Sequence, residues 1–189
     1  MKSLQTIGHA YTRAALLAAV ALLASCAISN DDSRLGMRTV KQVDLNRYMG
    51  DWYVIANIPN RAENDCYDSI EKYELRSDGR INNQFECRDG SFEKPLERRL
   101  DTIATIYDKQ TNAEWRVRIF KVIQAKYLVI DLDPEYRWAV VGHPSRDYGW
   151  VLARDKSLPG ETYASILERL RGQGYDVSRF VKIPQKSES

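Results

Sequence analysis

The sequence has few of the residues on which enzymes and metal sites depend. Only two histidines and three cysteines occur among its 189 residues. It contains no serine nucleophile elbow, zinc motif, phosphate loop or dinucleotide fingerprint. One of the two histidines, His9, lies close to the N-terminus, and the other, His143, precedes Pro144 in an expected loop. The sequence therefore predicts no catalytic residue, no cofactor and no metal site.

An excess of charge of one sign is also lacking. The chain has 28 lysines and arginines against 26 acidic residues, and no polybasic stretch. The first 25 residues carry two of the bases, Lys2 and Arg13, and no acid, so the remainder has a net charge of zero. Because nucleic-acid binding depends on positive charge, we expect no nucleic-acid partner.

No apolar run is long enough for a membrane-spanning helix. The longest extends from Ala14 to Leu23 and follows two basic residues. This pattern is typical of a signal peptide, which we place at residues 1–25. We therefore expect the chain to be exported.

A cysteine directly follows this segment. The stretch Leu23-Ala24-Ser25-Cys26 resembles the bacterial lipobox, in which the cysteine is lipidated and becomes the new N-terminus. Ala27 comes next, where an aspartate would suggest retention in the inner membrane. We therefore expect a lipid anchor on Cys26, a flexible tether over 26–41 and sorting to the outer membrane of a Gram-negative bacterium. An ordinary secretory signal with a chance cysteine is the alternative.

The rest of the chain is predicted to form one all-β domain over 42–184, followed by a disordered tail at 185–189. Apolar and polar residues alternate in short runs with turn residues between them, as in a barrel or sandwich. We expect eight strands, near 51–58, 69–76, 80–88, 99–108, 113–121, 126–133, 136–142 and 148–154.

A helix is predicted after the last strand, over Glu161–Gln173. Its apolar residues recur at helical spacing and give it one apolar face: Tyr163, Ile166, Leu167 and Leu170. We expect this face to pack against the outside of the β-structure.

Three motifs carry a resemblance to a known family. Gly50-Asp51-Trp52 opens the first strand, the segment from Leu132 to Tyr136 precedes the seventh, and the segment from Gly149 to Arg154 forms the eighth. In this order, behind a lipobox, they are similar to the lipocalins, and to the bacterial lipoprotein branch in particular. The middle motif departs from the commonest lipocalin form, threonine-aspartate-tyrosine, but fits the bacterial branch.

The resemblance implies an eight-stranded antiparallel up-and-down barrel with the C-terminal helix outside. Gly50, Trp52 and Arg154 are then expected at the closed end, where the guanidinium packs on the indole ring. The resemblance also implies a small amphiphilic ligand, and it specifies no oligomeric state.

Strand order places Cys66 and Cys87 at the same, open end of such a barrel. In an exported protein we favour a disulfide between them. The alternative is one or two free thiols.

Side-chain alternation, with Trp52 facing inward, places Val54 and Ala56 inside the barrel. For the other strands, a match to the lipocalin pattern implies the inward set, which includes Leu75, Thr102, Ile106, Trp115, Asp131, Ala139 and Leu152. The predicted ligand-binding residues are Val54, Ala56, Glu71, Tyr73, Asn83, Phe85, Ala104, Val117, Ile119, Tyr127, Val129, Val141 and Trp150.

Glu71 is the one acid among these predicted ligand contacts. We hypothesise that Glu71 and Asn83 orient a polar head group while aromatic side chains hold an acyl chain, with Lys121 near the mouth as a partner for the acid. Burial raises the pKa of a carboxyl group that lacks a partner.

These features predict a lipid-anchored protein that stores or transports fatty acids, lysophospholipids or similar amphiphiles, its barrel facing the periplasm. Two alternatives remain at this point. One is an enzyme that uses Cys87 as a cavity thiol. The other is a structural lipoprotein whose barrel is filled by its own side chains.

Overall fold

The computed structural model describes residues 36–119 and 123–186. The expected signal peptide, the lipobox with Cys26 and most of the expected tether lie outside the described residues. So does Lys121, the expected partner of Glu71.

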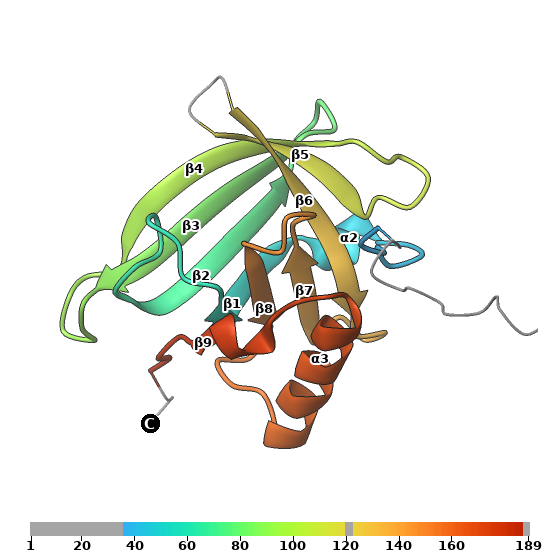
Figure 1. Ribbon diagram of the computed structural model, residues 1–189. Coiled ribbons are helices and arrows are strands. Elements are labelled where there is room, and N and C mark those ends of the chain that lie inside the picture. Colours follow the sequence, from blue (N-terminus) through green and yellow to red (C-terminus); the bar gives the residue numbers. More distant parts are fainter. Residues whose placement is uncertain (1–35, 120–122, 187–189) are drawn as a thin grey trace, which may run out of the picture. The chain divides into compact units, whose positions relative to one another are not determined.

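Eight antiparallel strands form a closed barrel (Figure 1). They are β1 (Gly50–Asn57), β2 (Cys66–Leu75), β3 (Ile81–Asp89), β4 (Glu97–Ile106), β5 (Glu114–Ile119), β6 (Ile123–Leu132), β7 (Trp138–Gly142) and β8 (Gly149–Ala153). Each strand pairs with the next, and β1 pairs with both β2 and β8, which closes the sheet. The predicted barrel is thus confirmed.

A ninth strand that the sequence did not predict extends this sheet. After the helix, a 3-10 turn η2 (Val177–Arg179) leads into β9 (Val181–Lys182). This strand pairs antiparallel with the C-terminal end of β1. β9 occupies the backbone edge of β1 beyond the four residues that pair with β2. The C-terminal segment is thereby part of the sheet.

Two apolar layers follow from the alternation of side chains. In β5, Trp115 and Val117 are buried inside the barrel, whereas Arg118 is exposed on the outer face. The second layer lies outside, between the barrel and α3 (Gly160–Gly172), whose Ile166 and Leu170 are buried. The predicted helix therefore packs on the outer wall, as Figure 1 shows.

Two of the predicted inward positions are wrong, because β-bulges reverse the alternation. In β1 the register shifts between Val54 and Ala56, so Ala56 packs in the outer layer under the helix. In β6 it shifts between Val129 and Asp131, and Asp131 forms an ion pair with Arg169 of the helix. A bulge adds one residue to a strand, and every later side chain then changes face.

The helix α2 (Leu45–Tyr48) closes one end of the barrel. It begins after Asp44, whose carboxylate accepts the backbone N–H groups of Asn46 and Arg47. The side chain of Tyr48 is fully buried inside the barrel, and its carbonyl accepts the indole N–H of Trp52 at 2.7 Å. The end predicted to be closed is therefore filled with side chains.

The segment before β7 supports this closed end from the side. Asp133 is buried and accepts two N–H groups of the Arg137 side chain. The hydroxyl of Tyr136 accepts the backbone N–H of Asp44 at 2.8 Å, and Arg47 lies over the Tyr136 ring. The motif that departs from the common lipocalin form thus ties α2 to the β6–β7 turn.

Both ends of the domain extend further than predicted. Residues 36–41 were expected in the flexible tether, but Val40 donates its N–H to the Val129 carbonyl, and Arg38 bonds to Gln173 of the helix end. Residues 185 and 186 were expected in the disordered tail. Instead, the Gln185 amide donates to the carbonyls of Val54 and Ser69.

Among the helices of residues 36–119 and 123–186, none has the length and apolar character needed to cross a membrane.

Candidate functional site

A cavity of about 410 Å³ occupies the barrel interior and reaches the loops that follow β1 and β7. Its apolar wall is formed by Leu100, Val117, Ile119, Ile123, Val141 and Leu152. Its polar groups include Asn60, Glu63, Glu71, Asn83, Thr102, Lys126 and His143. A volume in this range, an apolar wall and a few placed polar groups are typical of a small-molecule site.

The structure places most of the predicted ligand-binding residues on the cavity wall. Those that line it are Glu71, Tyr73, Asn83, Val117, Ile119, Tyr127, Val141 and Trp150. Four others are buried in the interior core without lining the cavity: Val54, Phe85, Ala104 and Val129. Only Ala56, displaced by the bulge in β1, packs outside the barrel.

A chain of three tyrosines joins the cavity to the closed end. The Tyr127 hydroxyl donates to the Tyr73 hydroxyl at 3.0 Å and lies 2.8 Å from that of Tyr48. The Trp115 ring stacks on Tyr127 with centroids 4.5 Å apart. Burial raises the pKa of Tyr73 and Tyr127 well above the usual range, so these hydroxyls remain protonated. They satisfy one another and fill the space between the cavity and Trp52.

Glu71 lines the cavity and has one unpaired carboxyl oxygen. Its side chain is only 8% exposed, and its Oε2 atom has no hydrogen-bond partner among the described residues. Burial raises the pKa of this carboxyl well above its usual value, and the negative charge of Glu63 raises it further. A hydrogen bond with Asn83 acts in the opposite direction, to a smaller extent. Burial therefore favours the protonated, neutral form of Glu71.

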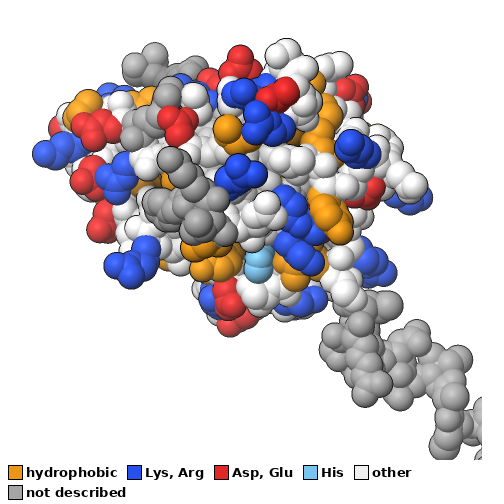
Figure 2. Space-filling model, turned by 90° about the horizontal axis from the view of Figure 1, so that it is seen from above, with side chains coloured by type: hydrophobic (Ala, Val, Ile, Leu, Met, Phe, Trp, Pro, Cys, Tyr) orange, Lys and Arg blue, Asp and Glu red, His pale blue; other side chains and the backbone are white. Residues whose placement is uncertain are grey.

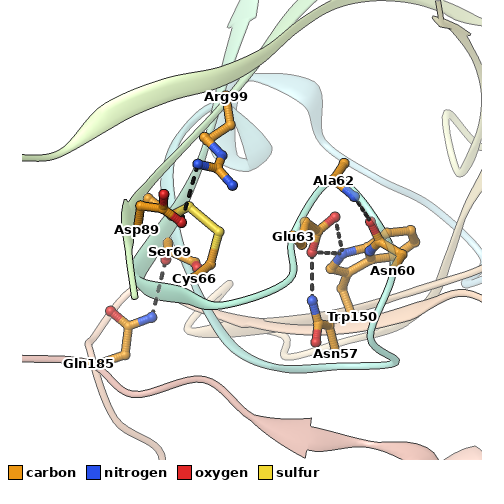
Figure 3. Close-up of a disulfide and its surroundings, with 11 residues drawn as sticks. Asn57, Asn60, Ala62, Glu63, Cys66, Ser69, Asp89, Arg99, Trp150 and Gln185 are labelled. Atoms are coloured by element: carbon orange, nitrogen blue, oxygen red, sulfur yellow. Dashed lines mark hydrogen bonds and ion pairs between the residues drawn. A yellow bond between two sulfur atoms is a disulfide. The ribbon is translucent and has the colours of Figure 1, made fainter. Parts of the chain in front are cut away.

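Glu63, in the loop after β1, holds the mouth of the cavity together (Figure 3). Its carboxylate accepts the Trp150 indole N–H at 2.9 Å and the Asn57 amide at 2.6 Å. Burial raises the pKa of Glu63, and these hydrogen bonds lower it. The sequence reasoning missed this residue because a loop has no alternation from which its direction can be predicted.

Several other lining residues were also missed. Ile123, Gln124, Ala125 and Lys126 belong to the first part of β6, which begins earlier than predicted, and Tyr148 comes from the loop before β8. Tyr148 stacks near Trp150, with ring centroids 6.4 Å apart. Figure 2 shows the molecule from above the view of Figure 1, and hydrophobic and basic side chains are interleaved on this face. His143 lies in the expected loop, between β7 and β8, and lines the cavity.

The two cysteines form a disulfide at the start of β2 and near the end of β3 (Figure 3). Their Cα atoms are 5.5 Å apart. The bridge confirms the favoured pairing and contradicts the alternative in which Cys87 acts as a free thiol, because a sulfur in a disulfide offers no thiolate. In the described part of the chain, no group of three histidine, cysteine or acidic side chains is placed to hold a metal ion.

A closed eight-stranded barrel with one filled end and an apolar cavity defines a ligand-binding calyx of the lipocalin type. The chain belongs to the lipocalin family: a family model described as a lipocalin-like domain matches residues 43–185.

Known relatives agree with this assignment. The chain is 33% identical over 168 residues to the outer membrane lipoprotein Blc of Escherichia coli K12, covering 89% of this chain and 94% of that protein. It is 31% identical over 157 residues to temperature-induced lipocalin-1 of Arabidopsis thaliana, covering 79% and 83%. Insecticyanin of Manduca sexta shares the fold, with a TM-score of 0.63 at 19% identity, covering 82% of this chain and 86% of that one.

Proposed function

We propose that this protein binds an amphiphilic lipid in its barrel and stores or transports it within the bacterial envelope. The observation that carries the proposal is the cavity of about 410 Å³ with an apolar wall. Burying an acyl chain against such a wall is favourable by about 25 cal/mol per Å² of apolar surface. The binding needs no reaction, cofactor or metal.

The division of the interior supports a ligand site over a barrel filled throughout. Below the cavity, Tyr48, Trp52 and Trp115 occupy the interior completely. Above them, Tyr73 and Tyr127 form the floor of an unfilled space bounded by Val117 and other apolar residues. A purely structural barrel gains stability from close packing, so a cavity of this size fits a role in binding.

A lipid on Cys26 would anchor the protein in the outer membrane with the barrel facing the periplasm. The similarity to a protein named as an outer membrane lipoprotein supports this location. The anchor, and not surface charge, would provide the attachment, since the sequence beyond residue 25 carries no net charge. Replacing Cys26→Ser in the full chain is expected to move the protein from the membrane fraction to the soluble periplasm.

Native mass spectrometry tests the binding itself. Residues 27–189, purified from a periplasm, are titrated with fatty acids and lysophospholipids. We expect a co-purified or saturable adduct of one lipid per chain. A chain that carries no lipid and takes up none from any of these amphiphiles contradicts the proposal.

A further inference from the structure

Three residues of the cavity wall, Asn60, Glu71 and Asn83, each carry a buried polar atom without a partner among the described residues, and Glu71 and Asn83 lie on adjacent strands. Glu71 Oε2 and Asn83 Oδ1 are both buried and accept or donate no hydrogen bond within the described residues. Glu71 lies opposite Phe85 in the β2–β3 ladder, and Asn83 lies opposite Tyr73. The two residues are therefore diagonal neighbours on the inner face of adjacent strands. Buried polar atoms in folded proteins are nearly always paired, so two that share one stretch of cavity wall indicate a ligand group.

The two atoms differ in what they offer. Asn83 Oδ1 is an acceptor. Burial and the charge of Glu63 raise the pKa of Glu71 and so favour its protonated carboxyl group, which has an O–H to donate. Neighbouring hydroxyls are already engaged: Thr102 points toward the Asn83 carbonyl, and Tyr127 donates to Tyr73. The unpaired atoms of Glu71 and Asn83 thus present one donor and one acceptor.

We propose that Glu71 and Asn83 form a subsite for an uncharged hydroxyl group on the bound lipid. The hydroxyl oxygen accepts from Glu71, and the hydroxyl hydrogen is donated to Asn83. This inference rests on the proposed function and names the chemistry of its ligand.

A fatty acid carboxylate fits this subsite poorly. It has no hydrogen to donate to Asn83 Oδ1, and it would bring a negative charge close to Glu63. Amphiphiles with an alcohol hydroxyl match the subsite better than fatty acids do. A glycerol hydroxyl meets this requirement, whether it belongs to a monoacylglycerol or to a lysophospholipid.

A matched pair of probes isolates the hydroxyl. 1-Hexadecanol and its methyl ether, 1-methoxyhexadecane, have the same chain, and only the alcohol donates a hydrogen bond. Dissociation constants are measured from the quenching of tryptophan fluorescence, since Trp150 lines the cavity. We expect the wild-type protein to bind the alcohol about tenfold tighter than the ether, because a site built for a hydroxyl rejects the analogue that lacks it. Hexadecanoate is expected to bind more weakly than the alcohol.

Variants test the two residues. Glu71→Leu and Asn83→Leu are each expected to reduce the tenfold preference to less than about twofold, since each removes one partner of the hydroxyl. Glu71→Gln, a neutral side chain that also donates and accepts, is expected to retain most of the preference. Asn82→Leu is the matched control, because Asn82 lies on the outer face and bonds to Glu74. Thermal unfolding of each variant shows that it is folded.

Equal affinity for the alcohol and the ether overturns the subsite, as does an unchanged preference in folded Glu71→Leu and Asn83→Leu proteins. Tighter binding of hexadecanoate also overturns it. In each of these cases lipid still binds, so the proposed function stands. Failure of every probe to bind contradicts the proposed function as well. If these results support the subsite, the dissociation constants of 1-monohexadecanoylglycerol and the corresponding lysophosphatidylcholine are compared. The lipid that binds more tightly identifies the source of the hydroxyl.

Discussion

Arg154 lies over the indole ring of Trp52, with its guanidinium carbon 3.7 Å from the ring centroid. The same guanidinium donates hydrogen bonds to the carbonyls of Arg47, Met49 and Asp51. Gly50 reaches this arrangement with a positive φ of 92°, which residues with a Cβ adopt at a cost. One side chain thus joins the end of β8 to α2 and to the start of β1.

Replacing Arg154→Met is expected to lower the free energy of unfolding by about 3 kcal/mol. The substitution removes the cation–π contact and leaves partly buried carbonyls without donors. Urea unfolding followed by tryptophan fluorescence measures the change. Arg80→Met serves as the control, because Arg80 forms an exposed ion pair with Asp78 at a β-turn, and its midpoint is expected to stay unchanged. Equal midpoints for the two variants would show that the closed end does not depend on Arg154.

Removal of the disulfide is expected to destabilise the domain by roughly 3 kcal/mol. The bridge joins residues 21 positions apart and restricts the unfolded chain. The Cys66→Ala, Cys87→Ala double variant is compared with the wild type in urea, with and without a reductant. The reductant is expected to lower the midpoint of the wild type only. A wild type that is insensitive to a reductant strong enough to break the bond contradicts the assigned contribution.

The stability of the protein is expected to fall as pH rises above the usual pKa of Glu71. The folded state raises that pKa well above 4.5, so at pH values between the two the unfolded chain releases the proton and the folded protein retains it. The free energy of unfolding then decreases by at most about 1.4 kcal/mol per pH unit for this group.

Glu71→Gln removes this dependence. The unfolding free energy of the wild type minus that of the variant is expected to decrease as pH rises above about 4.5, the usual pKa of the group. Glu63 also has a raised pKa but is present in both proteins, so its contribution largely cancels. A difference that stays constant over this range would falsify the assignment of a neutral Glu71.

Val117→Trp is expected to weaken lipid binding at least about tenfold, because the larger ring takes volume from the cavity. The cavity accommodates it, so the free energy of unfolding should change by less than the roughly 1–3 kcal/mol typical of overpacked cores. Arg118→Trp places the same ring on the outer face of β5 and is expected to leave binding unchanged. Titration with a lysophospholipid compares the two. Weaker binding in both variants, or in neither, contradicts a ligand inside the barrel.

Alternation and helical spacing predicted the strands and the outer helix, and the resemblance carried by the three motifs implied the barrel and the meeting of Trp52 with Arg154. A run such as Trp115-Arg116-Val117-Arg118 has one buried and one solvated face, and its period admits only a strand. The two motifs at either end of the domain fix where the barrel closes. The pairing of Cys66 with Cys87 followed from the same strand order.

The predictions of side-chain direction failed where the local backbone departs from regular alternation. The bulges at Ala56 and Asp131 reverse the direction of later side chains, and their presence depends on how neighbouring strands and α3 pack. Glu63 is aimed at Trp150 by the path of a loop, for which the sequence has no period. The Gln185 side chain bridges β1 and β2 by donating to the carbonyls of Val54 and Ser69, a long-range contact that no local pattern indicates.

The sequence by itself determined the fold, its closed end and the apolar character of the interior. The alternation of apolar and polar residues that decides which side chains are buried is already present in the local sequence of each strand. Tertiary structure alone decided how much of that interior is filled and which polar atoms remain unpaired in it. Those outcomes depend on the volumes and directions of side chains that meet from several strands. The free oxygens of Glu71 and Asn83, on which the choice of ligand rests, belong to this second group.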